Sequence, residues 1–450
     1  MIQLPGYGCS LEEDSVLHSS EKAKSAATDL EIVGIPRENI TTLPCESFEE
    51  TINYRCSCTF QIVIGDNSDL EYSMRSAKEA VPLGGDYFPI ATKRIQHNMK
   101  KVIQNLNKKD GEENYTFNDM RRNLSSISFA SSWNDDLDCI VTMNFCKPFF
   151  ECEESKKVIL NTADNFCKAS EITSLILRSK KVKEIVGRTP IFIDDVINIQ
   201  TSESNDILNI SLGRGDVNDN NTTPIFYRKP EDAFQHPNSN TMLQALKWML
   251  NKLHEIKAQS NYSDGVRFRL LEMYCGCGAH TMAIAKSNIF DTIVAVELDQ
   301  RLVQACQSNC EQNSCSPKDE NDDDKSTSVY VFQGDATEWA AKSMLRTRKE
   351  SEGTVYTASK LSKSYWYTQQ YNVFLVDPPR QGLSKEVCDL AANGSFEHML
   401  YISCGRDALK VDLQVLSTHF EVVDCTITDL FPRTTSVETL VHLQRRKVVQ

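Results

Sequence analysis

The sequence lacks a long hydrophobic run: no uninterrupted apolar stretch in its 450 residues is long enough to cross a bilayer. Its first residues, MIQLPGYGCSLEEDS, also lack the basic segment followed by an apolar one that is typical of a secretory signal. These two absences argue against a membrane protein and against a secreted protein. We therefore expect an intracellular protein, in the cytoplasm in the first place, with the nucleus and the organelles left open.

The cysteines lack the spacing of a metal site. The chain has 16 of them, but the tightest groups, at residues 56–58, 275–277 and 306–315, contain no paired C-x-x-C motifs and no run of iron–sulfur ligands. A chain of this length in a reducing compartment does not need disulfides either. The sequence thus indicates buried thiols, with one exception described below, and no metal.

A surplus of basic residues is also missing, since the formal net charge is -13. Proteins bind nucleic acids through Lys and Arg, so this total argues at first against a nucleic-acid partner. The charge is unevenly distributed, however. Acidic residues crowd the first fifty positions and residues 319–324, whereas Lys and Arg are frequent between residues 93 and 188. This distribution leaves room for a local basic surface in the N-terminal half.

The length of the chain favours two domains. Residues 1–50 are polar, acidic and weakly periodic, which predicts a loosely ordered leader. For residues 51–230 we expect an α+β domain. Alternation in residues 54–64, a Gly-Asp-Asn-Ser turn and residues 70–76 predict a β-hairpin, and residues 89–109 and 171–187 have helical spacing.

Residues 231–450 have a different sequence pattern, in which short apolar segments typical of strands alternate with segments typical of amphipathic helices. Such alternation predicts an α/β domain of the Rossmann-like type, with a mostly parallel sheet and helices on both faces. An amphipathic helix near residues 242–253 forms the join to the first domain. Two insertions interrupt the pattern, an acidic one near residues 316–328 and a long one near residues 346–370.

A glycine-rich turn follows the first strand of this domain. Gly276 and Gly278 stand between the strand ending at Tyr274 and an apolar helix, so the backbone can approach a ligand closely. Glu297 ends the next strand, where a carboxylate can accept both hydroxyls of a ribose. Thr281 occupies the place of the third glycine of a dinucleotide motif, which favours S-adenosylmethionine over NAD as the cofactor.

Three further residues stand where reactive groups are expected. Asp377, followed by two prolines, and Cys404 each end a buried strand, and ligands bind at the carboxyl edge of such a sheet. Cys404 also precedes a helix, whose positive end should lower the pKa of the thiol and make it a nucleophile. Glu438 starts the last strand, where a carboxylate can serve as a general base.

Taken together, the motifs LLEMYCGCG, VAVELD, VFLVDPPRQGLS, LYISCGRDAL and FPRTTSVE resemble the RNA m5U methyltransferase family. Within it, NYRCSCTFQI, the KRIQHNMKKVI helix, YRKPEDAFQHPN and LQALKWML are similar to the tRNA (uracil-5-)-methyltransferase branch, which modifies the T-loop uridine at position 54. The resemblance covers residues 51–444 and implies an RNA-binding N-terminal domain, S-adenosylmethionine as the cofactor and tRNA as the partner of a monomeric enzyme.

The resemblance also implies roles for individual residues. Cys404 is the nucleophile that attacks carbon 6 of uracil, and Glu438 is the base that removes the proton from carbon 5. The cofactor positions that it implies are Gln235, His236, Tyr274, Gly276, Glu297 and Asp377, and the RNA-facing positions are Arg380 and Arg55.

The sequence departs from the family pattern at several places. His236 stands where Gln is usual, with Gln235 one place earlier, while Ala279 and Ser436 replace a polar residue and a His. Other functions therefore stay open: methylation of another RNA, or a catalytically weak protein that binds or folds tRNA. An amino-methyltransferase is the third alternative, but Arg380 after the prolines and the presence of Cys404 argue against it.

Overall fold

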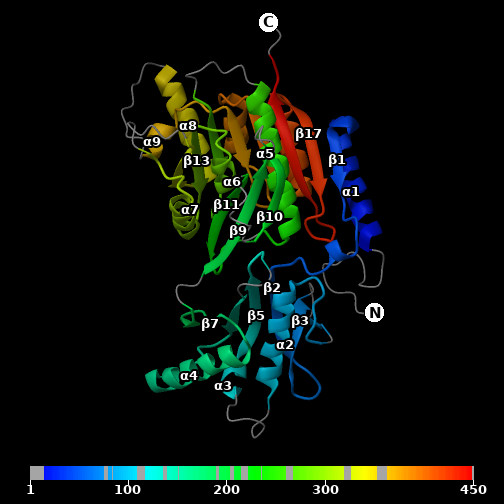
Figure 1. Cartoon of the computed structure of the whole chain (residues 1–450), viewed down its shortest axis with the longest axis vertical. Coiled ribbons are helices and arrows are strands. Elements are labelled where there is room, and N and C mark those ends of the chain that lie inside the picture. Colours follow the sequence, from blue (N-terminus) through cyan, green and yellow to red (C-terminus); the bar gives the residue numbers. More distant parts are fainter. Residues whose placement is uncertain are drawn as a thin grey trace.

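The structure is a computed structural model. It describes residues 15–75, 80–83, 85–108, 117–134, 139–150, 152–188, 192–202, 207–213, 221–234, 236–259, 267–318, 326–351 and 362–447. Figure 1 shows two lobes, an upper one built mainly from the C-terminal half and a lower one built from the N-terminal half. No helix among the described residues is long and apolar enough to span a membrane.

The upper lobe is organised by an eight-stranded sheet in the order β1-β17-β18-β16-β15-β12-β13-β14. Its parallel centre contains β12 (Arg269–Met273), β13 (Thr292–Glu297), β14 (Ser328–Gln333), β15 (Val373–Val376) and β16 (His398–Ser403). The strands β17 (Phe420–Thr428) and β18 (Glu438–Arg445) pair antiparallel with each other, and β18 pairs antiparallel with β16. The predicted α/β fold with a mostly parallel sheet is confirmed.

Alternate residues of these strands enter two different cores. Leu270 and Leu375 face one core and Leu271 and Phe374 face the other, because successive side chains of a strand point to opposite faces. The first core is covered by α5 (Ser239–Gln259), α6 (Ala279–Lys286) and α7 (Gln300–Gln312). The second is covered by α1 (Ser15–Ile32), α8 (Ala336–Ser351), α9 (Lys363–Trp366), α10 (Lys385–Asn393) and α11 (Arg406–Leu416).

The N-terminal segment differs from the loosely ordered leader that we expected. Residues 1–14 lie outside the described part of the chain, but α1 packs small side chains, Ala23, Ala26 and Ala27, into the second core. The strand β1 (Ile40–Leu43) then extends the large sheet by pairing parallel with β17. Figure 1 shows both elements at the edge of the upper lobe. Residues 15–43 are thus part of the C-terminal lobe.

The lower lobe contains a seven-stranded sheet in the order β4-β3-β2-β5-β6-β7-β8. The hairpin of β2 (Ser57–Ile64) and β3 (Leu70–Arg75) and the helix α2 (Lys93–Asn107) confirm two predictions. The remaining elements are β4 (Ala80–Pro82), β5 (Leu124–Ser131), β6 (Cys139–Phe145), β7 (Ser174–Arg178), β8 (Lys183–Gly187), α3 (Asn118–Arg121) and α4 (Glu153–Ala169).

The helix predicted over residues 171–187 is wrong, because this segment forms the hairpin of β7 and β8. Leu175 and Leu177 enter the core of the lower lobe, while Ile176 faces a small separate cluster. This alternation has the two-residue period of a strand. The backbone N–H of Ser179 donates to the carbonyl oxygen of Val182 and closes the turn.

The boundary between the lobes also lies earlier than the predicted residue 230. The strands β9 (Phe192–Thr201), β10 (Ile207–Leu212) and β11 (Thr222–Pro230) form a separate three-stranded sheet. Its buried residues Ile197, Ile225 and Tyr227 share the first core of the upper lobe with α5, α6 and α7. Residues 192–230 therefore belong with the C-terminal lobe (Figure 1).

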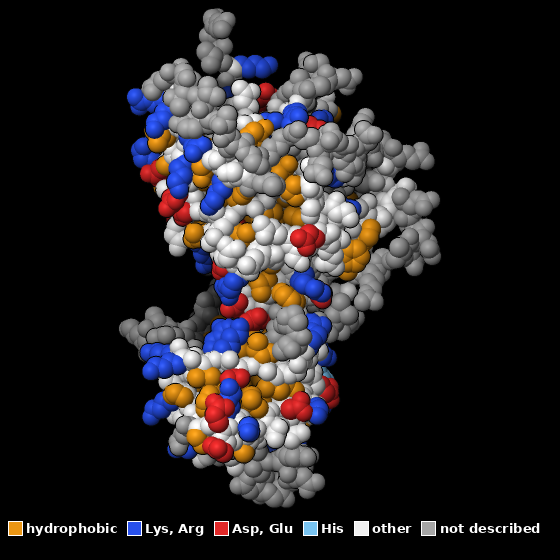
Figure 2. Space-filling model, turned by 90° about the vertical axis from the view of Figure 1, so that its left-hand side faces the viewer, with side chains coloured by type: hydrophobic (Ala, Val, Ile, Leu, Met, Phe, Trp, Pro, Cys, Tyr) orange, Lys and Arg blue, Asp and Glu red, His pale blue; other side chains and the backbone are white. Residues whose placement is uncertain are grey.

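Ion pairs connect the two lobes at their narrow waist. Arg178 and Lys183 of the β7–β8 hairpin pair with Asp232 and Glu231, which follow β11, and Arg301 of α7 pairs with Asp232 as well. Figure 2 shows basic and acidic side chains intermingled at this waist and further basic side chains over the lower lobe. Part of the basic charge of the N-terminal half is thus used within the protein.

Candidate active site

The register of the sheet brings three predicted residues to one edge. The strand β15 is parallel to β16, so Asp377 and Cys404, which follow them directly, leave the sheet on the same side. The strand β18 runs antiparallel to β16, with Thr439 opposite Ser403, so its first residue, Glu438, starts at that same edge. An acid, a thiol and a second acid therefore meet at the carboxyl edge of the sheet.

Cys404 lies between β16 and α11 and is only partly buried. The next residue must be small, because a Cβ atom on Gly405 would come within 2.3 Å of the carbonyl oxygen of Arg380. The Arg380 side chain is exposed, and its positive charge lowers the pKa of the Cys404 thiol. Arg380 thus stabilises the negatively charged form of the Cys404 sulfur.

The pKa of Cys404 shifts in the opposite direction to our expectation. Burial raises it first, the carboxylates of Glu438 and Asp377 raise it further, and Arg380 lowers it. The effect that we expected from the helix end is outweighed by desolvation and by two acids in the same site. The thiol is therefore protonated in the free protein at neutral pH, and Arg380 becomes the main group that favours its ionisation.

Glu438 is 4% exposed, and its Oε2 atom lies 3.0 Å from Nε2 of His236. The other ring nitrogen, Nδ1, lies 2.8 Å from the carbonyl oxygen of Asn238. Burial alone would lower the pKa of His236, but Glu438, the Asn238 carbonyl and Asp377 together raise it. The imidazole is therefore held between two oxygen atoms, one of which belongs to the candidate base.

Asp377 completes this group of charged side chains. Its pKa is raised to about 7 by burial and by Glu438, against a lowering effect of His236. Nδ1 of His280, in the first turn of α6, lies 4.0 Å from Oδ2 of Asp377, and burial next to His236 lowers the pKa of His280 to about 4. His280 was not predicted from the sequence, although its place two residues after Gly278 was a signal.

The glycine-rich turn has the backbone geometry of a ligand-binding loop. Tyr274, Gly276 and Gly278 all have positive φ angles, of 66°, 55° and 85°. A Cβ atom on Gly278 would lie 2.5 Å from the sulfur of Cys306, so the helix α6 can begin here only after a glycine. No atom lies within 4 Å of the corresponding position on Gly276, which leaves space above the loop.

Glu297 is fixed at the end of β13 by two backbone amides. Its Oε2 atom accepts a hydrogen bond of 3.0 Å from the N–H of Gly276, and Oε1 accepts one of 2.9 Å from the N–H of Asp299. Each carboxylate oxygen keeps further acceptor capacity, which matches the two neighbouring hydroxyls of a ribose. The residues present therefore fit a nucleoside cofactor.

Two further residues predicted for the site are Gln235 and Arg55. Gln235 lies outside the described residues. The Arg55 side chain donates to the carbonyl oxygen of Ser57 and lies over the ring of Phe431, 5.5 Å from its centre. Its backbone bridges to Asn238 of the upper lobe. Arg55 thus stands where the lower lobe meets the loop that leads to Glu438.

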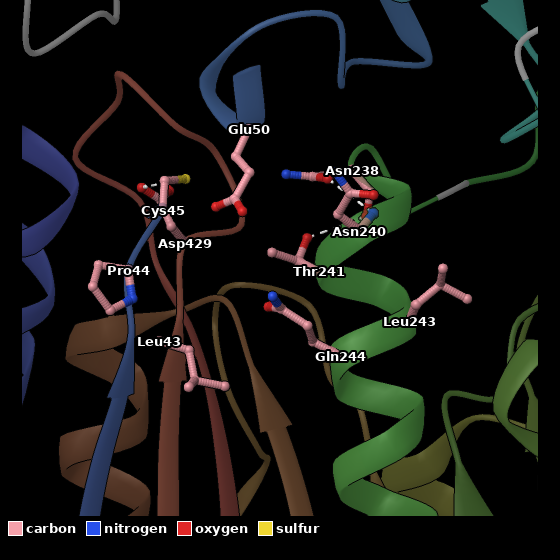
Figure 3. A pocket seen from close by; sticks show the side chains of 10 residues that line it. All are labelled: Leu43, Pro44, Cys45, Glu50, Asn238, Asn240, Thr241, Leu243, Gln244 and Asp429. Atoms are coloured by element: carbon pink, nitrogen blue, oxygen red, sulfur yellow. Dashed lines mark hydrogen bonds between the residues drawn. The ribbon is translucent and has the colours of Figure 1, made fainter. Parts of the chain in front are cut away.

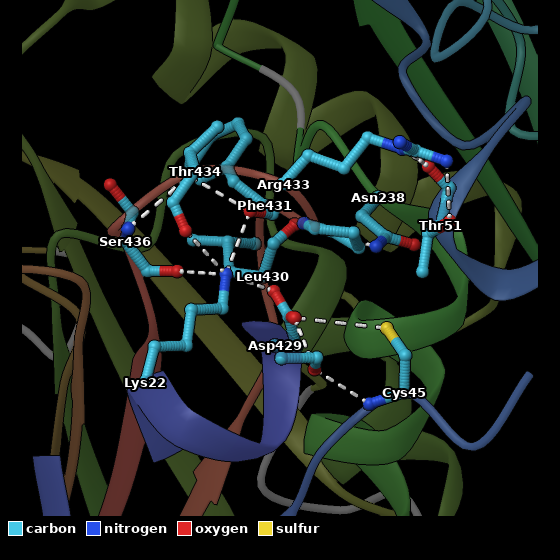
Figure 4. A network of polar contacts seen from close by, with 12 residues as sticks. Lys22, Cys45, Thr51, Asn238, Asp429, Leu430, Phe431, Arg433, Thr434 and Ser436 are labelled. Atoms are coloured by element: carbon cyan, nitrogen blue, oxygen red, sulfur yellow. Dashed lines mark hydrogen bonds and ion pairs between the residues drawn. The ribbon is translucent and has the colours of Figure 1, made fainter. Parts of the chain in front are cut away.

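That loop, residues 429–437, is held by the N-terminal segment. The ammonium group of Lys22 in α1 donates to the carbonyl oxygens of Phe431, Thr434 and Ser436 at 2.8–2.9 Å and pairs with Asp429 at 2.5 Å. Figure 4 shows these contacts converging on Lys22 from several sides of the loop. The helix that we expected to be part of a loose leader thus fixes the segment that delivers Glu438.

A second buried cation secures the same loop. Arg433 is fully buried with a φ angle of 69°, and its guanidinium donates to the carbonyl oxygen and the hydroxyl of Thr51 at 3.1 Å.

Beside the loop lies a polar cavity of about 340 Å³ (Figure 3). It is lined by Leu43, Pro44, Cys45, Glu50, Asn238, Asn240, Thr241, Leu243, Gln244 and Asp429.

Replacement of Lys22 by methionine is expected to lower the free energy of unfolding by about 3–5 kcal/mol, because the buried Asp429 and three carbonyl oxygens lose their partner. Urea unfolding followed by circular dichroism measures this difference. Lys24→Met, at an exposed position of the same helix, is the matched control and should change stability little. Equal stability of the two variants would contradict the structural role of Lys22.

The described residues contain no group of three or more His, Cys, Asp or Glu side chains that could hold a metal ion. The cysteines of residues 275–277 and 306–315 are buried free thiols with raised pKa values.

Comparison with known proteins connects this geometry to a family. The family model described as tRNA (uracil-5-)-methyltransferase matches residues 39–318 and 357–446. A tRNA/tmRNA (uracil-C(5))-methyltransferase of Pseudoalteromonas translucida is 26% identical, with 95% of each chain covered. One from Campylobacter lari is 25% identical over 87% of this chain and 90% of that protein.

The fold is similar to that of a solved structure. The Pyrococcus abyssi tRNA (uracil-54, C5)-methyltransferase in complex with S-adenosyl-L-homocysteine superposes with a TM-score of 0.56 at 14% sequence identity. The superposition covers 95% of this chain and 84% of that protein. At this level of identity the likeness concerns the fold.

Proposed function

The chain belongs to the tRNA (uracil-5-)-methyltransferase family, and we propose that it methylates carbon 5 of the T-loop uridine at position 54 of tRNA, with Cys404 as nucleophile and Glu438 as base. It is an S-adenosylmethionine-dependent enzyme of RNA modification. The observation that carries the assignment of roles is the meeting of Cys404, Arg380 and Glu438 at one edge of the sheet.

The chemistry explains why a thiol and a carboxylate are both needed. Carbon 5 of uracil is a weak nucleophile. The Cys404 thiol first loses its proton to solvent, and attack of the resulting thiolate on carbon 6 converts the ring into an enolate that is nucleophilic at carbon 5. When bound, S-adenosylmethionine supplies the methyl group as a sulfonium. Glu438 then takes the proton from carbon 5, the double bond between carbons 5 and 6 forms again, and the sulfur leaves as a thiolate.

The surrounding residues support these steps. The positive charge of the Arg380 guanidinium lowers the pKa of Cys404 and stabilises the thiolate both before attack and after departure. Glu297, with both oxygens fixed by backbone amides, binds the ribose of the cofactor, while Tyr274, Gly276 and Asp377 line the rest of its site. The target base must leave its stack to reach Cys404, and Arg380 and Arg55 contact the RNA around it.

Mass spectrometry of nucleosides provides the test of this function. Unmodified tRNA incubated with the protein and S-adenosylmethionine should gain one 5-methyluridine, and tRNA with cytidine at position 54 should gain none. Methylation of the second tRNA at another site, or of ribosomal RNA only, would support a different RNA substrate. Binding of tRNA without any methylation would support the catalytically weak protein instead.

We further propose that the enzyme acts in the cytoplasm as a monomer that needs no metal.

The cofactor site can be tested separately. Glu297→Ala should weaken the binding of S-adenosyl-L-homocysteine by roughly 1.5–3 kcal/mol, because a charged hydrogen-bond acceptor for the ribose is lost. Isothermal titration calorimetry measures this change, and tRNA affinity should stay the same. Glu311→Ala, at an exposed position of α7, is the control. Unchanged cofactor affinity in Glu297→Ala would sink the assignment.

A further inference from the structure

The ring of His236 contacts the candidate base, Glu438, at 3.0 Å. The sequence predicted that His236 or Gln235 reaches the cofactor, yet both ring nitrogens of His236 are engaged by protein oxygens, those of Asn238 and Glu438. The backbone of His236 is fixed as well, because its carbonyl oxygen accepts from the indole N–H of Trp133 at 2.8 Å and from the thiol of Cys56 at 3.3 Å. Trp133 and Cys56 thus hold the backbone of His236, and Asn238 and Glu438 hold its ring.

The proton count of this contact is restricted by its geometry. A backbone carbonyl oxygen only accepts, so Nδ1, 2.8 Å from the Asn238 oxygen, must carry a hydrogen. A neutral imidazole would then present a bare Nε2 to the Glu438 carboxylate. The 3.0 Å contact between Nε2 and Oε2 therefore needs one more proton, shared between His236 and Glu438.

The surrounding charges determine where that proton resides. The groups that face His236 are the carboxylates of Glu438 and Asp377, and the imidazole of His280, whose pKa of about 4 leaves it neutral. The two acids favour the imidazolium form of His236, in agreement with its raised pKa. The resting pair is therefore an imidazolium hydrogen-bonded to a carboxylate.

We propose that His236 is the positioning residue of the base: it holds Oε2 of Glu438, which leaves the carboxylate ionised and its other oxygen, Oε1, directed to the hydrogen on carbon 5. This inference rests on the proposed function and adds a step-specific role to it. Among the described residues Oε1 has no hydrogen-bond partner, whereas Oε2 is occupied by His236.

The role concerns one step of the reaction. The bond between carbon 5 and hydrogen breaks, the proton goes to Oε1 of Glu438, and the electron pair forms the double bond between carbons 5 and 6. The bond between carbon 6 and the Cys404 sulfur breaks, and its electron pair stays on the sulfur. The positive charge of Arg380 stabilises the resulting thiolate. The proton passes to solvent when the product leaves. Attack and methyl transfer precede this step and do not need His236.

The test therefore measures proton removal rather than overall activity. In His236→Phe, turnover should fall by about 10- to 100-fold, as when a metal-ligating side chain loses the hydrogen-bond partner that orients it. The methylated covalent protein–RNA complex should accumulate, and the isotope effect from tRNA made with 5-deuterated uridine should rise above that of the unaltered enzyme. His236→Gln, whose amide can still donate to Oε2, should recover part of the rate and a smaller isotope effect.

Controls separate this role from a structural one and from the proposed function. Calorimetry with S-adenosyl-L-homocysteine should give the same affinity for the His236 variants and for His419→Gln, an exposed control. Lost cofactor affinity with an unchanged isotope effect would overturn the inference and return His236 to the cofactor site. If Glu438→Gln also fails to accumulate the complex, the base itself is misassigned, and the proposed mechanism fails together with this inference.

Discussion

Replacement of Cys404 by alanine is expected to abolish methylation and to prevent any covalent bond with RNA. Without the sulfur, carbon 6 is not attacked, carbon 5 stays a weak nucleophile, and the rate should fall at least ~10⁴-fold, as for other enzymes that lose their nucleophile. The variant should still bind tRNA, because Arg380, Arg55 and the lower lobe are unchanged. Denaturing electrophoresis with labelled tRNA shows directly whether an adduct forms.

The control for this experiment is another cysteine of the same chain. Cys146→Ala removes an exposed thiol in the lower lobe, outside the site, and should keep full activity. An adduct that survives denaturation in Cys404→Ala would mean that a different residue is the nucleophile. Loss of activity in Cys146→Ala would instead indicate that thiols of the lower lobe take part.

The positions of Asp377 and Cys404 could be predicted because a parallel sheet brings all its carboxyl ends to one edge. The position of Glu438 could not be predicted in this way. Its strand runs antiparallel between β16 and β17, and only that pairing brings the start of β18 to the same edge. The motif resemblance supplied the role of Glu438, whereas the register explains how it reaches Cys404.

The packing of the N-terminal segment on the C-terminal lobe could not be predicted from the sequence, for a physical reason. The helix α1 buries mainly Ala, Ser and one Lys, so it has little of the hydrophobic periodicity that identifies an amphipathic helix. Its stability comes from packing and from the contacts of Lys22 with residues far away in the chain. Such contacts depend on tertiary structure, and composition alone indicated a loose segment.

The pKa of Cys404 shows a similar limit. A cysteine before a helix predicts an acidic thiol when only local structure is considered. In the folded protein, burial and the carboxylates of Glu438 and Asp377 raise the pKa instead, and the opposing Arg380 comes from a different strand end. The local signal pointed to Cys404 as a candidate nucleophile, but the pKa of this thiol depends on three residues that the fold brings together.

Replacement of Glu438 by glutamine is expected to stop the reaction after methyl transfer. Cys404 can still attack carbon 6 and the methyl group can still arrive, but an amide cannot remove the proton from carbon 5, so turnover should fall by roughly 10²–10⁴-fold. Glutamine keeps the size of the side chain and an oxygen that can accept from Nε2 of His236, 3.0 Å from the carboxylate in the structure.

The trapped complex provides the measurement. Radioactive methyl from the cofactor should migrate with the protein–RNA band of Glu438→Gln on a denaturing gel, and no such band should form with Cys404→Ala or with the double variant. The double variant is decisive, because it keeps the altered base and removes only the sulfur that makes the bond. If Glu438→Gln turned over at the normal rate, the proton would be removed by another group, and Asp377, with its pKa raised to about 7 at the same edge of the sheet, would be the residue to replace next.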